Sequence, residues 1–451
     1  MKKKYLISTF LALSVSAACL SGCEPKILKE AEAEEKVHIS FSFWEPSVDN
    51  NLQNGLEKVI ENYGKIHPEV EVELISKPVS GYQDWIKEQY AANRAPTIES
   101  NHTPNLATRY EQGLVYDFKD ELKKINEYDG VVWKDEFSER KLEQADNGIT
   151  LPWFDLGVAY YYNKNVYKEL NLTVPETWNE FMSNCRAIED YGKTPIALMA
   201  QKKDALVWLK LYIEGGMISR YVNKEEYDAD QDGSVSTDDV YKAIVSGKLD
   251  VTKGEPKKML SELLDCYKLY GRYAHNAIEL DETEAKQKFL TGEAVHIMTG
   301  SWDMKGFEEN KSENVDIGVF KLPKFTAENT EYPGNTPFLG GVQSLAITAS
   351  ATEEQKTAAM DFLKFLFSKE QYNVFYETTM QMPTMKGFDN EQMYEPFRAQ
   401  GGNSRAGMIV DSEDTKISCE IFSGMEISAD EFAEEIQKST EAIAKKYIKS
   451  E

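Results

Sequence analysis

Cysteine and histidine are both scarce in this chain, with five of each among 451 residues. Beyond residue 23 the remaining cysteines are Cys185, Cys266 and Cys419, each isolated from any second metal ligand. Such a set cannot build a disulfide framework, so we expect buried free thiols. The scattered histidines suggest neither a zinc site nor a catalytic triad.

Basic residues are outnumbered, since 51 lysines and arginines stand against 76 aspartates and glutamates, for a formal net charge of −25. Such a surface repels nucleic acid and anionic lipid. The chain also lacks a Gly-x-Ser-x-Gly elbow, a His-Glu-x-x-His helix and a Gly-rich phosphate loop. We therefore expect a monomeric binding protein that is not an enzyme and does not bind nucleic acid.

Long apolar runs are confined to the N-terminus, where three lysines precede an apolar stretch over residues 5–20. The stretch is too short for a membrane span and has the form of a secretory signal peptide. The LSGC tetrad that follows, ending at Cys23, resembles a bacterial lipoprotein cleavage box. The resemblance implies a signal peptide over residues 1–22 and acyl chains, palmitate among them, that anchor Cys23 in the membrane. An ordinary secretory signal is the alternative.

The folded part begins after a charged tether over residues 23–35, which lacks aromatic residues. Residues 37–43 (VHISFSF) alternate apolar and polar side chains as a strand does, residues 51–66 have helical spacing, and residues 70–75 (VEVELI) alternate again. This order predicts two parallel strands joined by a helix. No Pro/Gly/Ser-rich linker interrupts the later segments, so two closely joined α/β bodies are expected.

Four further segments carry motifs in a fixed order. They are GLVYDF (113–118), the stretch from DNGITLPWFDLG to TWNEF (146–181), FLTGEAVHIMTGSWDM (289–304) and FLGGVQSLAITASATEEQ (338–355). In this order they resemble the extracellular solute-binding proteins of sugar ABC importers, the family that includes maltose-binding protein. One position departs, because Ala95-Pro96 is followed by Thr97 where the family usually has aspartate.

The resemblance implies an α/β, two-lobe, periplasmic-binding-protein-like type II fold. Each lobe would be a mixed sheet flanked by helices, with the ligand cleft between the lobes. The expected N lobe comprises residues 36–155 and 342–381, and the expected C lobe residues 156–338 and 385–451. Three crossings of the chain between the lobes would lie near residues 155–158, 338–342 and 381–384.

A sugar site needs aromatic plates for the apolar face of the ring and polar groups for its hydroxyls. The candidate ligand-binding residues are aromatic or polar, and topology or the resemblance places them at the cleft. They are Trp44, Glu45, Asn101, Trp153, Asp155, Trp208, Trp302, Asp303 and Phe338. For each tryptophan, packing in the core is the alternative.

The segment DADQDGSVSTDDV, residues 228–240, has the spacing of a calcium loop. Such loops take ligands from positions 1, 3, 5, 7, 9 and 12 and place glycine at position 6. The corresponding ligands would be Asp228, Asp230, Asp232, Ser234 through its carbonyl, Ser236 and Asp239. The closing aspartate resembles dockerin loops, but a single copy favours a structural calcium site, carried by an insertion at about residues 217–256. A solvated acidic turn is the alternative.

The expected function is therefore that of a lipid-anchored extracytoplasmic receptor that closes on a carbohydrate and delivers it to the permease of an ABC importer. A tethered glycan hydrolase remains an alternative, because acidic pairs are plentiful. A receptor for polyamines or peptides, or a co-receptor for a sensor kinase, is a second alternative.

Overall fold

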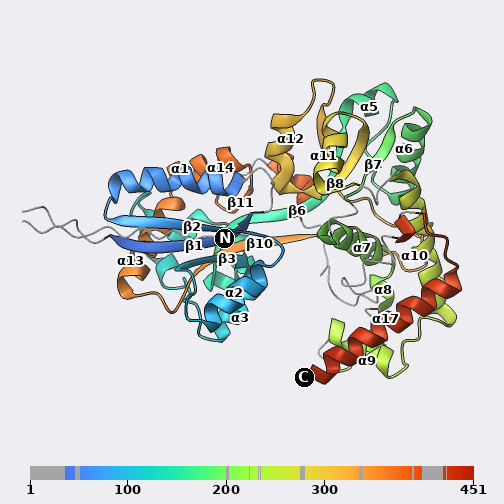
Figure 1. Ribbon diagram of the computed structural model, residues 1–451, viewed down its shortest axis with the longest axis horizontal. Coiled ribbons are helices and arrows are strands. Elements are labelled where there is room, and N and C mark those ends of the chain that lie inside the picture. Colours follow the sequence, from blue (N-terminus) through green and yellow to red (C-terminus); the bar gives the residue numbers. More distant parts are fainter. Residues whose placement is uncertain are drawn as a thin grey trace, which may run out of the picture.

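The computed structural model describes residues 36–45, 51–199, 203–222, 224–231, 233, 235–274, 280–334, 339–388, 391–398, 420–422 and 424–450. The signal peptide, the tether, Cys23, Cys419 and Phe338 lie outside these ranges. Figure 1 shows two bodies, here called the N lobe and the C lobe, side by side along the longest axis of the molecule. This arrangement confirms the predicted two-lobe α/β fold.

The first strands confirm the predicted parallel unit. Strand β1 (Val37–Glu45) and strand β2 (Val70–Pro78) pair in parallel along their whole length, joined by helix α1 (Asn51–Ile66). The apolar positions of β1 are buried, and α1 buries the stripe that contains Leu52, Leu56 and Val59. The alternation in β1 and the helical spacing in α1 therefore place both apolar faces in one core.

A single sheet runs through both lobes in the order β2-β1-β3-β10-β6-β8-β7, with β9 and β11 also paired to β6. Strand β6 (Leu151–Asn163) belongs to both lobes. Its first half pairs with β10 up to Gly157, and from Val158 onward it pairs with β8. The chain therefore crosses between the lobes at these two residues, inside the predicted range of 155–158.

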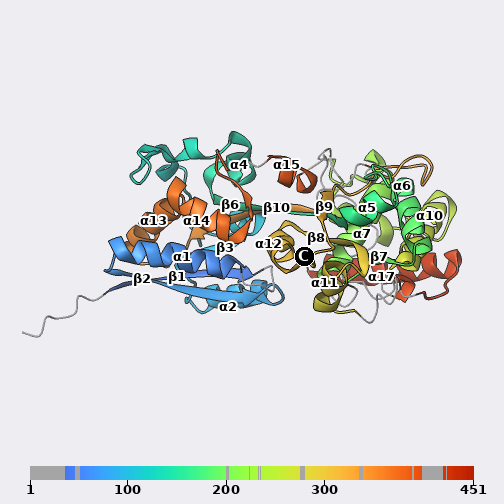
Figure 2. The ribbon, with the colours of Figure 1, turned by 90° about the horizontal axis from the view of Figure 1, so that it is seen from above.

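The remaining elements of the N lobe flank its part of the sheet, as Figures 1 and 2 show. The elements before β6 are α2 (Tyr82–Ala91), β3 (Ile98–His102), α3 (Thr103–Glu111), η1 (Glu121–Lys123), β4 (Ile125–Asn126), β5 (Val131–Val132), η2 (Trp133–Glu136), α4 (Glu139–Gln144) and η3 (Asp146–Gly148). The returning chain adds β10 (Gly340–Ile347), α13 (Glu353–Leu366), α14 (Lys369–Thr379) and β11 (Met382–Pro383).

The C lobe is built from the second half of β6 and from elements on both sides of it. These are α5 (Lys164–Glu169), α6 (Trp178–Asp190), β7 (Thr194–Ala197), α7 (Lys203–Met217), α8 (Ser219–Val222), η4 (Glu225–Tyr227), α9 (Thr237–Val245), α10 (Gly254–Tyr273), α11 (Glu282–Leu290), β8 (Ala294–Gly300), η6 (Ser301–Asp303), α12 (Met304–Asn310) and β9 (Ile317–Phe320). The last elements are α15 (Glu391–Tyr394), η7 (Glu395–Phe397) and α17 (Ala429–Ser450).

Neighbouring tyrosines of β6 show how the C lobe forms its layers. Tyr160 points toward α6, α7 and α10, where it packs against Phe181 and hydrogen-bonds to Tyr270. Tyr161 points to the opposite face and packs against Phe307 of α12. The period-two alternation of the strand thus supplies one large side chain to each layer.

The last crossing lies later in the chain than predicted. Strand β11 pairs with the N-lobe half of β6, and Met385 bridges to Phe137 in the N lobe. The Phe388 ring also packs against Tyr372 of α14, with 5.0 Å between the ring centroids. The apolar side chains as far as Phe388 thus pack in the N-lobe core, whereas the predicted C lobe starts at residue 385.

The prediction of buried free thiols is confirmed for the two cysteines in the described part of the chain. Cys185 and Cys266 are buried free thiols. Trp178, behind a Thr177–Glu180 capping box, is buried in the C-lobe core. None of the described helices is long and apolar enough to cross a membrane.

His296 on β8 is fully buried in the C lobe. Its Nδ1–H donates to the Pro195 carbonyl at 2.8 Å, and its Nε2 accepts from the Tyr167 hydroxyl at 2.7 Å. Burial lowers the pKa of His296 from 6.5 to about 3, although the hydrogen bond to Pro195 opposes the shift. The side chain is therefore a neutral part of the core near neutral pH.

This burial predicts an acid-sensitive stability. Between about pH 6.5 and pH 3 the unfolded chain binds a proton at His296 that the native chain does not, so the free energy of unfolding falls as pH falls. The slope from this residue is at most about 1.4 kcal/mol per pH unit. Chemical denaturation across this range should show a shallower slope in His296→Gln. The matched control is His38→Gln, at a side chain 68% exposed, which should keep the wild-type slope; an unchanged slope in His296→Gln would refute the prediction.

Candidate functional site

Trp302 stands at the point where β8 ends beside the crossing. Gly300 pairs with Val158, and the η6 turn then carries Trp302 back over Gly300. A Cβ atom at Gly300 would lie 2.2 Å from the indole ring, so the glycine is required for this close approach. Trp208 of α7 contacts Trp302, with 5.2 Å between the ring centroids. The structure thus brings together two of the predicted tryptophans on the C lobe.

Asp303, in contrast, is not free to contact a ligand. Its carboxylate is 2% exposed and accepts from Lys286 Nζ at 2.7 Å and from Thr299 Oγ1 at 2.6 Å. Burial works against the charged lysine, but the nearby carboxylates of Asp303 and Glu282 outweigh it and raise the pKa of Lys286. In this arrangement the Asp303 carboxylate anchors the turn that carries Trp302.

Trp44 forms an aromatic group at the carboxyl end of β1. Its ring centroid lies 5.2 Å from that of Tyr82 and 5.0 Å from that of His102. The side chain is 7% exposed, at the end of the strand. Glu45, the next residue, accepts the backbone N–H of Gln53 at 3.1 Å in the first turn of α1. The Glu45 carboxylate thus stabilises the helix N-terminus.

Asn101, another predicted ligand contact, is fully buried. Its carboxamide exchanges hydrogen bonds with Gln83 and donates to Glu99 Oε1 at 2.8 Å. Glu99 is itself buried and lies 3.1 Å from Arg109. Desolvation raises the pKa of Glu99, while the Arg109 charge opposes this shift. This network fixes β3 onto α2 and α3 and leaves the Asn101 amide without capacity for a ligand.

Trp153 also lies in the core and not at a cleft surface. It is 0% exposed and packs against Phe41 and Phe375, with centroid distances of 5.4 and 5.3 Å. A register shift between Gln343 and Ser344 places this part of β6 out of step with β10, and Trp153 takes the inward position. Asp155, two residues on, forms an ion pair with Lys141 of α4. Trp153 and Asp155 are therefore structural in the arrangement shown.

The two aromatic groups lie on opposite sides of the crossing. On the N-lobe side, His102 contacts Trp44 and lies beside Gly341, which pairs with Leu156. On the C-lobe side, Trp302 covers Gly300, which pairs with Val158. Leu156 and Val158 are separated by one residue of β6. Aromatic faces that belong to different lobes, joined at such a hinge, suit the apolar face of a sugar ring.

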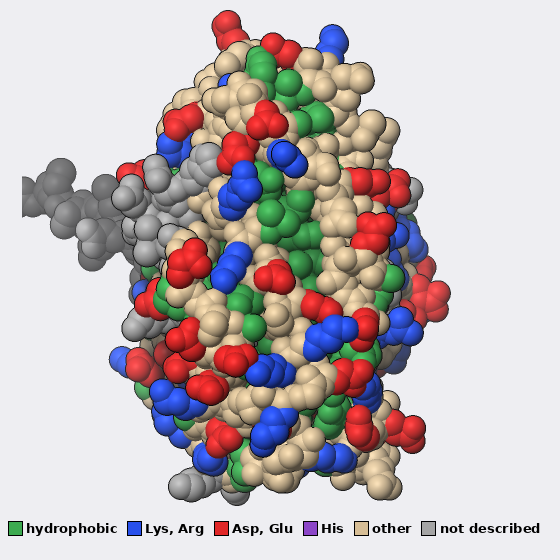
Figure 3. Space-filling view, turned by 90° about the vertical axis from the view of Figure 1, so that its right-hand side faces the viewer, with side chains coloured by type: hydrophobic (Ala, Val, Ile, Leu, Met, Phe, Trp, Pro, Cys, Tyr) green, Lys and Arg blue, Asp and Glu red, His purple; other side chains and the backbone are tan. Residues whose placement is uncertain are grey.

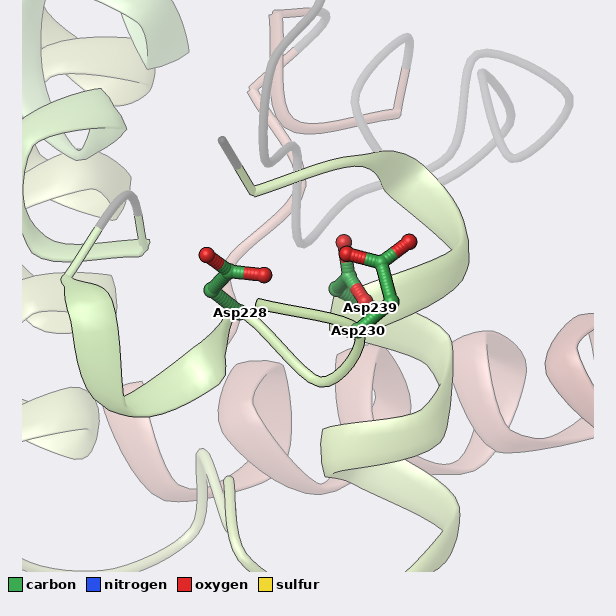
Figure 4. A group of neighbouring side chains, drawn as sticks. All are labelled: Asp228, Asp230 and Asp239. Carbon is green, nitrogen blue, oxygen red and sulfur yellow. The ribbon is translucent and has the colours of Figure 1, made fainter. Parts of the chain in front are cut away.

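The acidic loop lies in the C lobe between η4 and α9. One carboxylate oxygen from each of Asp228, Asp230 and Asp239 lies within 4.8 Å of those of the other two. Figure 4 shows the three side chains on the loop. Gln231 and Gly233 adopt left-handed backbone conformations, with φ of 61° and 89°. Asp232 and Ser234 lie outside the described residues. Three of the predicted carboxylates therefore converge, and oxygen donors at this spacing suit calcium.

Hydrogen bonds hold these carboxylates in place, and they bear on whether the side chains can serve as charged calcium ligands. Asp228 accepts the backbone N–H groups of Gln231 and Gly233 at 2.7 and 2.9 Å. Asp239 accepts from Ser236, both backbone N–H and hydroxyl, in a capping box at the start of α9. Burial opposes its ionisation, but these hydrogen bonds and one from Ala229 lower the pKa of Asp239. The carboxylate stays charged, as a calcium ligand must.

Some residues around the site escaped prediction from the sequence. In the sequence Lys286 stands four residues after Glu282, a spacing that is typical of an ion pair on a helix surface. The spacing therefore did not indicate the buried contact with Asp303. Tyr82 and His102, the neighbours of Trp44, come from separate elements. Gly300 is the one residue here with a local sequence signal, because a glycine within a strand often marks a place where another group comes close to the backbone.

A sequence model of the bacterial extracellular solute-binding proteins matches residues 58–396 of this chain. A galactooligosaccharide-binding protein of Bacillus subtilis strain 168 is 22% identical over 395 residues, which cover 87% of this chain and 83% of the relative. A multiple sugar-binding protein of Streptococcus mutans serotype c is 23% identical over 388 residues, which cover 83% of this chain and 81% of the relative.

The fold is also found among solved structures. A solute-binding protein determined in complex with raffinose aligns with a TM-score of 0.66 and 16% identity, over 91% of this chain and 100% of its own. At this identity the likeness concerns the fold, and it matches the two lobes joined by a shared sheet.

Proposed function

This chain belongs to the bacterial extracellular solute-binding proteins, and we propose that it is an extracytoplasmic receptor that captures a sugar or oligosaccharide for an ABC importer. The observation that carries this proposal is the pair of aromatic groups on either side of the β6 crossing, around Trp44 and Trp302. The sugar-binding relatives support the same class of ligand. The family consists of binding proteins, so the hydrolase alternative is set aside.

Ligand capture would proceed by hinge closure about β6. A sugar that contacts both indole groups stabilises the arrangement in which the lobes are closest, and the equilibrium shifts toward it. A cationic polyamine would instead need unpaired carboxylates. Glu99, Asp155 and Asp303 are each committed to an internal arginine or lysine, which favours a neutral, hydroxyl-rich ligand.

The membrane anchor belongs to the same proposal. Acylation of Cys23 would hold the receptor at the outer face of the membrane, near the permease. On the face shown in Figure 3, basic side chains are scattered among acidic ones and form no separate patch. The formal net charge of −25 favours attachment through lipid over electrostatic adsorption to anionic headgroups.

Calcium in the acidic loop would be structural. The loop connects η4 to the first turn of α9, and α9 packs against α17. Val235, at the eighth position of the loop, is buried against the C-lobe core. A cation bound by Asp228, Asp230 and Asp239 would hold the insertion onto the lobe.

The sugar prediction is tested by calorimetry with galactooligosaccharides, raffinose and maltose on the mature protein. Wild type should bind at least one of them without hydrolysing it. Trp302→Ala should weaken that binding by about 10- to 100-fold, because the stacking face is lost. Tyr191→Ala, at a C-lobe side chain 42% exposed, is the control and should bind as wild type does. Equal affinity of Trp302→Ala and wild type would exclude the stacking role.

The calcium prediction is tested by thermal unfolding in calcium and in chelator. At about tenfold excess over its dissociation constant, calcium should stabilise the native state by about 1.4 kcal/mol. Asp228→Asn should lose this response, and Asp265→Asn, at an exposed acid on α10, should keep it. Identical melting curves of the wild type in both buffers would contradict the proposal, whereas sugar binding should persist in chelator.

The anchor prediction is tested by labelling bacteria that express the full chain with radioactive palmitate. Wild type should carry the label and sediment with membranes, because the acyl chains partition into the bilayer. Cys23→Ala should lose the label and appear in the soluble extracytoplasmic fraction. Label retained by Cys23→Ala would rule out acylation at this residue.

A further inference from the structure

The carboxamide of Gln381 is buried without any hydrogen-bond partner. The side chain is 2% exposed, and neither Nε2 nor Oε1 has a partner in the described part of the molecule. Its backbone N–H, in contrast, donates to Thr379 Oγ1 at 3.3 Å. Buried amides nearly always find partners, so one with both ends unpaired calls for an explanation.

The residue before it shows a second unfavourable feature. Met380, at the C-terminal end of α14, has φ 50° and ψ 30°, in the left-handed region. A methionine rarely adopts this conformation, which normally falls to glycine or asparagine at the end of a helix. The Tyr394 hydroxyl donates to the Met380 carbonyl at 3.3 Å and helps to hold the turn. Two unfavourable features therefore occupy adjacent positions, and such features cluster at switch regions.

This pair of residues lies beside the crossing in β6. Met382 pairs with Asp155 and Pro383 with Phe154 in antiparallel register, so Gln381 falls beside Leu156. Met382 lies in the same apolar cluster as Tyr161 and Phe397 of the C lobe. Gln381 thus occupies a place whose surroundings change when the lobes rotate.

The second connection between the lobes has a related feature. Gln343 on β10 is 2% exposed and donates through Nε2 to Ser100 Oγ at 2.9 Å, but its Oε1 has no partner among the described residues. Gln371 of α14, by contrast, accepts from Asn62 Nδ2 at 3.0 Å and lies away from the crossing. Among the described glutamines, the buried carboxamide atoms without a partner are thus found where β10 and β11 meet β6, while Asn51 Nδ2 at the start of α1 is a further unpaired amide.

We propose that Gln381 is a positioning residue for hinge closure, whose carboxamide lacks partners in the arrangement shown and forms hydrogen bonds when the lobes close on a sugar. The inference rests on the proposed function and adds a residue that does not touch the ligand. A group that is penalised in one arrangement and satisfied in the other shifts the equilibrium toward the second. Its removal lowers the population competent to bind, and the apparent affinity falls with it.

The test uses Gln381→Met in the full mature chain, because methionine keeps the length of the side chain and removes the amide. Loss of an unpaired buried amide should raise the melting temperature by about 1–3 °C. The affinity for raffinose, galactooligosaccharide or maltose, whichever binds wild type, should fall by about 5- to 50-fold. Gln371→Met, which removes a paired amide from helix α14, should lower the melting temperature and leave the affinity unchanged.

Three outcomes would overturn the inference alone. They are a melting temperature of Gln381→Met that falls like that of Gln371→Met, an unchanged sugar affinity, and an ordered water bonded to Gln381 in a sugar-free crystal structure. If wild type binds no sugar of the panel, the proposed function fails and this role of Gln381 fails with it. Wild-type binding that is lost selectively in Gln381→Met supports both.

Discussion

The hydrogen bonding of β6 to both lobes is the constraint on which the rest of the structure depends. One backbone segment pairs with β10 up to Gly157 and with β8 from Val158 onward. Relative motion of the lobes must therefore be absorbed within a few residues. Gly157 is closely packed there, because a Cβ would lie 2.3 Å from the Phe397 carbonyl oxygen. The crossing is thus a defined hinge and not a loose linker, and groups near it sense the lobe arrangement.

Buried charges near this crossing are neutralised by ion pairs within the same lobe. The chain is strongly acidic, yet the buried Glu99 and Asp303 are paired with Arg109 and Lys286. A buried carboxylate without a partner would cost several kcal/mol, so each such acid near the site brings its own cation. Polar capacity is then spent on fixing the turns, and under the proposed function the aromatic faces would be left for the ligand. This division would let an acidic receptor present a neutral site.

Sequence patterns predicted the positions of helices and strands better than they predicted which side chains pack or pair with one another. The alternation in β1 and the helical spacing over residues 51–66 were sufficient to locate a strand and a helix, because both patterns depend on neighbouring residues. The position of Trp153 in the core depends on a register shift against β10, and the state of Asp303 on a lysine in α11. Neither partner is encoded locally, so the sequence predicted the fold but not the packing of these two side chains.

In the acidic loop, by contrast, the convergence of the carboxylates was predictable from the sequence, because its twelve positions are contiguous. Asp228 and Asp239 meet because left-handed residues turn the chain between them and Ser236 fixes the start of α9. In Figure 1, α9 and α17 lie at the edge of the C lobe, away from β6. A cation bound there would add rigidity to α9 and its packing on α17 without reaching the indoles near the hinge. The proposed metal site and the proposed sugar site would thus lie apart, and the free energies of binding at the two sites should add.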